Sequence, residues 1–196
     1  DDLKKAVELD PNHISTYCLT FEEDTALYAK LAQGKITLDS DREAAFYEFA
    51  WDYLPSMGLN QYEVSNYAKD GYQCRHNLNT WRMHDWIGYG PSASSQYKKV
   101  RWKNFANIEQ WAKPLLLSAS LEYEEHIKLS ANELARDAIL FGLRMNDGIN
   151  LSHIGEQFGI ASDIFDGVHQ FFKLLEKEKL SDREIDTHFL TAEGRI

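Results

Sequence analysis

The chain has 196 residues, of which 43% are apolar and 13% aromatic, and its formal net charge is −10. This composition suffices for one large hydrophobic core or two small ones, and the acidic balance disfavours a nucleic-acid partner because phosphate binding depends on Lys and Arg. No apolar run reaches the roughly 20 residues of a membrane span, and two cysteines without a charged-then-apolar leader favour a cytoplasmic location.

The first part of the chain predicts a mixed α/β structure. An amphipathic helix over residues 1–9 is followed by a strand over 12–21, a long helix that starts at the capping box of residues 40–43, and a strand over 61–67. Strand, helix and strand make a βαβ unit with parallel strands. Two strands cannot bury both faces, so they fit the end of a larger α/β barrel, and their open edge predicts self-association.

Residues 62–95 are the most informative stretch for a ligand site. They contain most of the strand over 61–67 and, after its end, Cys74, His76 and Trp81, then Gly88 and Gly90 with small residues after them. Loops at the carboxyl ends of parallel strands commonly bind ligands, and glycine lets backbone approach a ligand closely. We therefore expect this stretch to form one wall of a site.

After Pro114 the pattern becomes mostly helical. A capping box at Ser130 opens one helix, further helices are expected over residues 151–158 and 164–175, and a short strand covers 188–190. This is the element order of a winged helix. The region that would read DNA carries Asp163 and Asp166 and no Lys or Arg, so a packing or lid domain is favoured over DNA binding.

Four ordered segments and one later one resemble a known family. They are HISTYCLT at 13–20, QYEVSNYA at 61–68, HNLNTW at 76–81, DWIGYGPSA at 85–93 and FGLR at 141–144. The chain resembles the radical SAM proteins of the oxygen-independent coproporphyrinogen III oxidase type, and within them the radical SAM haem chaperones. It departs from the family at Thr80, where Tyr is usual in the haem chaperone branch, and in lacking the CxxxCxxC cluster motif.

The resemblance implies two domains. Residues 1–117 would be the carboxyl-terminal part of a radical SAM (β/α) barrel, and residues 118–196 the helical, winged-helix-like carboxyl-terminal domain of the coproporphyrinogen oxidase type. Two distant cysteines cannot supply a 4Fe-4S cluster, so we expect the chain to be part of a longer protein and to be unable, alone, to hold a cluster or cleave S-adenosylmethionine.

The resemblance also implies site residues. S-adenosylmethionine would lie near Tyr17 and Cys18 and near the segment Pro91, Ser92, Ala93 and Ser94. Haem would contact His76, Asn77 and Trp81, with the His76 imidazole on the iron. Judged by residue type alone, His76 and Asn77 better suit the capping of a turn, and the resemblance brings haem binding level with that interpretation. Glu63 suits either a polar cofactor group or solvent.

Three functions stay open at this point. As a carrier, the protein would bind haem and pass it to a recipient. As an oxidoreductase of porphyrin biosynthesis, the full-length protein would use its cluster and S-adenosylmethionine to decarboxylate coproporphyrinogen III oxidatively to protoporphyrinogen IX. As a third alternative, the chain in isolation would be a structural domain without a ligand. The resemblance at residues 76–81 favours the carrier.

Overall fold

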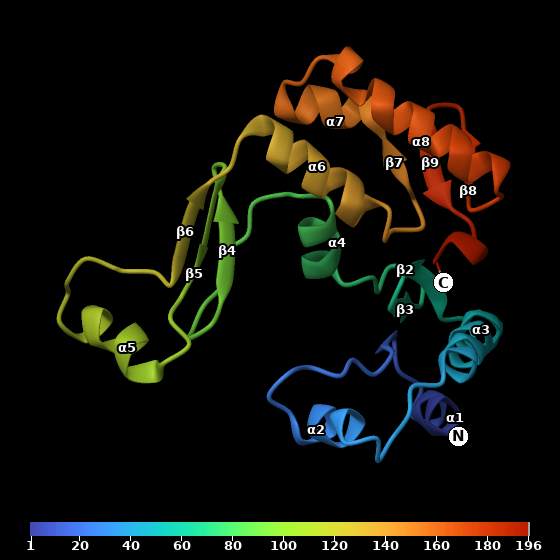
Figure 1. The fold of residues 1–196 in the computed structure, drawn as a ribbon, viewed down its shortest axis with the longest axis horizontal. Coiled ribbons are helices and arrows are strands. Elements are labelled where there is room, and N and C mark those ends of the chain that lie inside the picture. The colour runs from blue at the N-terminus through green and yellow to red at the C-terminus, as the bar shows by residue number, and fades with distance from the viewer. Residues whose placement is uncertain (196) are drawn as a thin grey trace. The chain divides into compact units, whose positions relative to one another are not determined.

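The computed structural model describes residues 1–195, which form two compact units, residues 1–73 and residues 74–195 (Figure 1). Ile196, the last residue of the predicted second domain, lies outside the described residues. Among the helices of residues 1–195, none combines the length and apolar character needed to cross a membrane.

Three helices belong to the first unit, and the first and third of them pack on its small core. They are α1 (Asp2–Glu8), α2 (Ala26–Ala32) and α3 (Ser40–Ser56). The amide of Arg42 donates to the side chain of Asp39, so the cap of α3 is one residue earlier than the predicted Ser40. Leu54 and Tyr67 are fully buried at the centre of the core, and the apolar face of α1 packs against it. The expected amphipathic helix at the start of the chain is therefore present.

The sheet of the first unit corrects the predicted βαβ pairing. Its strands β1 (His13–Ser15), β2 (Asn60–Glu63) and β3 (Asn66–Ala68) are arranged in the order β1-β3-β2, and both pairings are antiparallel. The single strand predicted over 61–67 is a hairpin, because the chain turns at Val64 and Ser65. The strands joined by α3 do run parallel, as predicted, but β3 lies between them. The self-association predicted through an open edge stays a prediction, for which β1 and β2 are the outer strands.

The second unit begins with a short helix and an antiparallel sheet. Helix α4 (Arg75–Trp81) precedes β4 (Ser94–Tyr97), β5 (Val100–Lys103), α5 (Ile108–Leu116) and β6 (Glu125–Lys128), and the sheet order is β4-β5-β6 (Figure 1). Strands β5 and β6 pair along their whole length, on opposite sides of the predicted domain boundary between residues 117 and 118. A division there would cut this sheet, whereas the compact units divide between Gln73 and Cys74.

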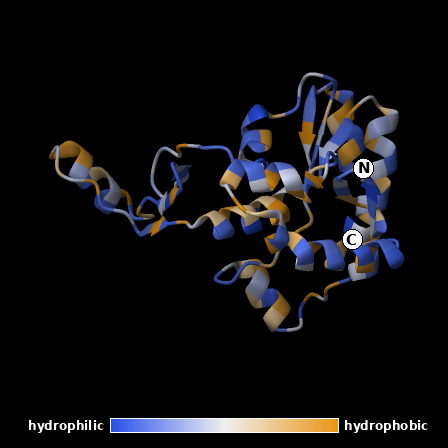
Figure 2. Cartoon of the chain, turned by 90° about the horizontal axis from the view of Figure 1, so that it is seen from above, coloured by the Kyte–Doolittle hydropathy of each residue, from blue (hydrophilic) through white to orange (hydrophobic). Residues whose placement is uncertain are grey.

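Helix α5 is amphipathic and leaves much of its apolar surface exposed. Ile108 is 65% exposed and Leu116 is 82% exposed. In Figure 2 this helix lies at the left end of the view and carries a group of hydrophobic residues. Asn107 caps it by accepting hydrogen bonds from the amides of Glu109 and Gln110.

The remainder of the second unit has the predicted winged-helix order. Its elements are α6 (Ala131–Gly142), β7 (Ile149–Asn150), α7 (Leu151–Phe158), the 3₁₀ helix η1 (Ser162–Phe165), α8 (Asp166–Lys177), β8 (Ser181–Glu184), β9 (Thr187–Leu190) and the 3₁₀ helix η2 (Glu193–Arg195). The strands form an antiparallel sheet in the order β7-β9-β8. Ser130 and Glu133 form the complete capping box expected at the start of α6. The core between these elements centres on Leu134 and Phe172.

Candidate functional site

Helix α4 presents the predicted haem-contacting residues on two neighbouring faces. His76 and Thr80 are four residues apart and share one face, while Asn77 and Trp81 share the next. His76 is exposed, whereas Asn77 and Trp81 are half-buried. The helix therefore offers the imidazole to solvent and directs the indole toward the protein.

The His76 imidazole is available to a ligand. Neither His76 nor Asn77 makes a side-chain hydrogen bond within residues 1–195, so the turn-capping alternative has no counterpart in the described structure. The Thr80 hydroxyl donates to the carbonyl oxygen of His76 at 3.0 Å, which ties this side chain back to the helix. An exposed imidazole without a protein partner fits the requirement for an axial haem ligand.

The Trp81 indole packs between α4 and α6. Its ring centroid lies 5.7 Å from that of Phe141, and the guanidinium carbon of Arg144 lies 4.6 Å from the indole centroid. The indole Nε1 is buried and has no hydrogen-bond partner among the described residues. One face of the indole is thus covered by a cation, which limits the area that it could offer to a porphyrin.

The segment from Gly88 to Ser94 is a tightly packed turn. A Cβ atom on Gly88 would overlap the carbonyl oxygen of Ser94, and Ser92 has a positive φ of 61°. The amides of Ser92 and Ala93 donate to the carbonyl oxygens of Phe105 and Gly90. These two main-chain donors are therefore occupied, so a cofactor at this turn would meet its hydroxyls and its apolar surface.

Tyr17 and Cys18 line a cleft of about 510 Å³ in the first unit. The cleft also contains Arg42 and Phe46 of α3, whose side chains are stacked with the guanidinium carbon 5.3 Å from the ring centroid. An aromatic ring suits an adenine base, and a guanidinium suits the carboxylate of an amino acid. Sequence reasoning found Tyr17 and Cys18 and missed Arg42 and Phe46, because nothing in their spacing relates α3 to residues 16–19.

Glu63 lies neither in solvent nor against a cavity. Its side chain is fully buried, and its Oε1 accepts hydrogen bonds from the amide of Ser65 at 2.8 Å and from the Asn66 side chain. Asn66 in turn accepts from the Ser15 hydroxyl at 2.5 Å. This network joins β1 to the β2–β3 hairpin, so the carboxylate acts in the fold of the first unit.

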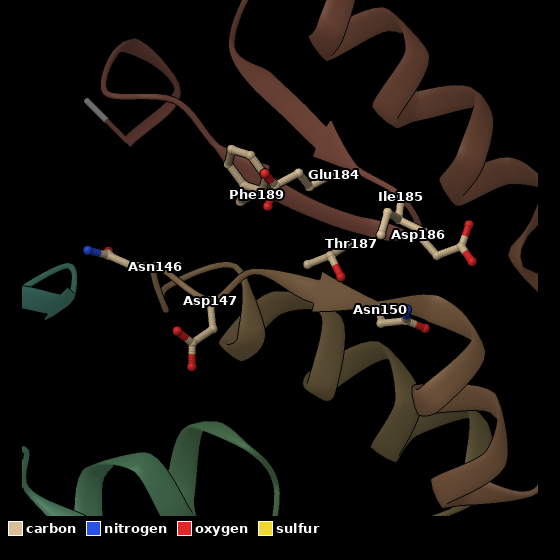
Figure 3. Close-up of a pocket in the computed structure, with 8 residues that line it drawn as sticks. All are labelled: Asn146, Asp147, Asn150, Glu184, Ile185, Asp186, Thr187 and Phe189. Atoms are coloured by element: carbon tan, nitrogen blue, oxygen red, sulfur yellow. The ribbon is translucent and has the colours of Figure 1, made fainter.

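A cavity of about 540 Å³ lies beside the β8–β9 turn of the second unit (Figure 3). Asp147, Glu184 and Asp186 line it, and the carboxylates of Asp147 and Asp186 point away from each other in the close-up. Asp147 pairs with Arg82 and Asp186 with Arg183. None of the residues predicted as site residues lines this cavity, and its carboxylates are ill suited to an anionic tetrapyrrole.

The residues present do not fit a 4Fe-4S cluster. The sequence has two cysteines, neither of which is in a disulfide, and Cys18 belongs to the first unit while Cys74 belongs to the second. Within residues 1–195, no group of three or more His, Cys, Asp or Glu side chains is placed to hold a metal ion. A cluster typically takes four thiolates, or three together with an open site for a substrate.

Comparisons with known proteins identify relatives over nearly the whole chain. It is 26% identical to the protein named Heme chaperone HemW of Bacillus subtilis, covering 99% of this chain and 51% of the relative. A protein of the same name from Mycobacterium tuberculosis is 33% identical over 79% of this chain and 41% of the relative. The protein named Radical S-adenosyl methionine domain-containing protein 1, mitochondrial, of Dictyostelium discoideum is 32% identical, covering 100% of this chain and 50% of the relative.

One solved structure matches the fold of this chain, and its title is "Coproporphyrinogen III oxidase (HemN) from Escherichia coli is a Radical SAM enzyme". The match has a TM-score of 0.73 and 19% sequence identity, and it covers 98% of this chain and 47% of that one. This match supports the fold predicted from the sequence. No family model matches the chain. The chain spans about half the length of the curated relatives that it matches.

Proposed function

Because this chain is related by sequence to haem chaperones and other radical SAM proteins, we propose that it belongs to a haem-binding chaperone and that it carries the axial haem ligand His76. The observation that supports this most directly is the state of His76, whose imidazole is exposed on α4 and free of protein hydrogen bonds within residues 1–195. Neutral imidazole is a common axial ligand of haem iron.

The neighbours of His76 support an orienting role for the rest of α4. Asn77 lies one residue further along and has a free side-chain amide, which can donate to a propionate. Trp81 is held by Phe141 and Arg144, so it fixes α4 against α6 and offers only its uncovered part to a ligand. In this proposal His76 binds the iron, Asn77 orients the porphyrin and Trp81 holds the helix.

Titration of the protein with haem tests the proposal. Ferric haem with a bound imidazole has a Soret band that shifts when the ligand is lost, so His76→Ala should remove the ligated spectrum of this site. The matched controls His84→Ala, His153→Ala and His169→Ala should retain it. A spectrum that is unchanged in His76→Ala would overturn the assignment of His76.

S-adenosylmethionine is proposed to contact Tyr17 and Cys18 in the cleft of the first unit, and its contact with Pro91, Ser92, Ala93 and Ser94 stays a prediction from the family resemblance. In radical SAM proteins the cluster and this cofactor together supply a radical. The residues described here provide no ligand set for the cluster, so the chain alone should show neither stoichiometric cluster absorbance after anaerobic reconstitution nor production of 5′-deoxyadenosine. Either signal would contradict the expectation.

The alternative is an oxidoreductase that decarboxylates coproporphyrinogen III. It requires the cluster and both cofactor contacts, whereas haem binding requires a ligand that this chain already presents. Assays with coproporphyrinogen III and haem on the same preparation separate the two functions. The assignment of residues 1–117 to a barrel and of 118–196 to a carboxyl-terminal domain, and a cytoplasmic location, are parts of the same proposal.

A further inference from the structure

Helix α8 and the 3₁₀ helix η1 before it carry a row of apolar residues on their solvent side. Ile164, Phe171 and Leu174 are 54%, 55% and 61% exposed. Phe172, on the other side of the helix, is buried in the core. Gly167 lies between Ile164 and Phe171, and a Cβ atom there would have open space around it. Residues three and four apart lie on one side of a helix, so these residues form one row. We call it the α8 row: Ile164, Gly167, Phe171 and Leu174.

A charged row runs beside the α8 row, one residue earlier along the helix. It contains Asp163 and Asp166 near the start of the helix, Gln170 in the middle, and Lys173 and Lys177 near the end. All five side chains are exposed, and the four charged ones make no ion pair within residues 1–195. Acidic groups at the start of a helix and basic groups at its end suit the helix dipole. They also divide the charged row into an acidic half and a basic half.

The order of these charges suits a second copy of the chain whose α8 runs in the opposite direction. Across a twofold axis between antiparallel helices, residues equally far from the axis lie opposite each other. With the axis at Gln170, Asp163 of one copy faces Lys177 of the other, and Asp166 faces Lys173. A parallel arrangement would instead place each charge beside its own like.

The same axis gives the α8 row a matching partner. Gly167 of one copy lies opposite Phe171 of the other, so the phenyl ring can occupy the open space beside the glycine. Ile164 lies opposite Leu174, and both side chains are more than half exposed in the single chain. Glu178, the C-cap residue of α8, lies past Leu174 and outside this apolar contact. One axis therefore brings together apolar side chains and opposite charges.

We propose that α8 is a self-association surface through which two copies of the chain pair in antiparallel orientation. In helix-turn-helix proteins that bind DNA, the recognition helix enters the major groove, whereas the exposed side of α8 carries apolar residues and unpaired charges of both signs. A contact between one helix and its equivalent is small, and small interfaces belong to weak, transient complexes. The dissociation constant should therefore be micromolar or higher.

Sedimentation velocity of the whole chain measures this association over loading concentrations of roughly 10 μM to 1 mM. No haem is present, so the outcome is independent of the haem-binding role of His76. The wild type should shift from monomer to dimer as the concentration rises. Phe171→Glu should raise the dissociation constant by about tenfold or more, because it buries a carboxylate in the apolar contact. Leu140→Glu, at a similarly exposed position of α6, is the matched control and should leave the constant unchanged.

Two results of this measurement would overturn the proposal. One is a wild type that stays monomeric at every concentration. The other is a dissociation constant that is unchanged in Phe171→Glu, which would direct attention to the outer strands β1 and β2 as the place of self-association. Circular dichroism checks that each variant is folded.

An exchange of charges tests the pairing between the two copies. Asp163→Lys combined with Asp166→Lys makes the charged row basic, and Lys173→Glu combined with Lys177→Glu makes it acidic. Each double variant alone should stay monomeric, whereas an equimolar mixture of the two should form a heterodimer, which native mass spectrometry identifies. Charges that only stabilise the helix would give no heterodimer, and that result would overturn the pairing.

A cysteine at the axis tests the orientation of the helices. In a chain with Cys18→Ser and Cys74→Ser, Gln170→Cys should form a disulfide-linked dimer on air oxidation, because Gln170 lies beside its own equivalent. Lys177→Cys should not, since Lys177 faces Asp163 of the other copy. Cross-linking through both positions would indicate parallel helices and overturn the antiparallel pairing, and so would a failure of Gln170→Cys to cross-link.

Discussion

The guanidinium of Arg144 lies over the indole of Trp81, with its carbon 4.6 Å from the ring centroid. Arg144 follows the end of α6 and Trp81 is the last residue of α4, so this contact joins the helix that carries His76 to the winged-helix core. It explains why a tryptophan in a segment that resembles a haem-binding motif is directed toward the protein.

Replacing Arg144 should loosen α4. A cation–π contact contributes about 0.5–1 kcal/mol at exposed sites, so Arg144→Leu should lower the free energy of unfolding of the second unit by about that amount or more. The exposed Arg136 of α6 provides the matched control, Arg136→Leu, which should change stability little. Urea denaturation followed by tryptophan fluorescence measures both. Equal effects of the two variants would contradict the role of the stacked pair.

Glu63 should be important for the first unit. In Glu63→Leu the amide of Ser65 and the side chain of Asn66 lose their acceptor in a buried setting, which costs on the order of 1–3 kcal/mol for each unsatisfied group. Glu63→Gln keeps one acceptor oxygen and should lose less. Glu48→Leu on the exposed side of α3 is the control, with an expected change within about 0.5 kcal/mol. Thermal denaturation ranks the stability of the three variants. A loss of stability in Glu63→Leu no larger than that in Glu48→Leu would contradict the stabilising role of the Glu63 carboxylate.

Gly88 should not tolerate a side chain. A Cβ atom there would overlap the Ser94 carbonyl oxygen, so Gly88→Ala should shift the turn at Pro91 and destabilise the protein by about 1–3 kcal/mol, as overpacking commonly does. Gly167 in α8 has open space around its Cα, and Gly167→Ala should stabilise by up to about 1 kcal/mol. Chemical denaturation should show a lower free energy of unfolding for Gly88→Ala and a higher one for Gly167→Ala. An unchanged free energy of unfolding in Gly88→Ala would contradict the close packing of Gly88 against Ser94.

His188 should make the second unit less stable in acid. Burial lowers the pKa of His188 from its ordinary value of 6.5, although the nearby Glu176 carboxylate opposes this shift. The folded protein therefore keeps the imidazole neutral at a pH where the unfolded chain takes up a proton. The resulting stability is complete above about pH 6.5 and is lost as the pH falls below that value.

Two measurements check this expectation. NMR titration of the His188 ring should give a midpoint below 6.5, and His188→Phe should flatten the dependence of unfolding free energy on pH in this range. The stacking of His188 on Phe172, at 4.2 Å between centroids, makes phenylalanine a suitable replacement. An identical pH dependence in the variant would show that other groups are responsible.

The sequence predicted the helical elements better than the sheets. The capping box at Ser130 and the apolar spacing of α6, α7 and α8 are local signals, and the winged-helix order follows from them. The β2–β3 hairpin was missed because its turn, Val64 and Ser65, lacks the Asn-Gly or Gly residues typical of tight turns. The strand expected over 12–21 is shorter, because only residues 13–15 find a partner in β3.

In the candidate sites too, features that depend on local spacing could be predicted, whereas contacts between distant segments could not. His76, Asn77 and Trp81 lie in one short segment, so their common location follows from helical spacing, while the burial of Trp81 depends on α6. Arg42 and Phe46 line the same cleft as Tyr17 because the fold brings α3 next to residues 16–19, which their spacing in the sequence does not predict. His126 lies opposite Trp102 through a cross-strand register that the 23 intervening residues along the chain do not reveal.

The pairing of β5 with β6 decides how the protein can be divided in the laboratory. Separation after residue 117 would leave β5 with an unpaired edge on one piece and β6 without its partner on the other, and both exposed edges would favour aggregation. Separation between Gln73 and Cys74 cuts no strand and keeps each sheet within one piece. Expression of residues 74–195 alone would therefore isolate α4, the sheet β4-β5-β6 and the winged helix together, so that haem binding by these elements can be measured without the first unit.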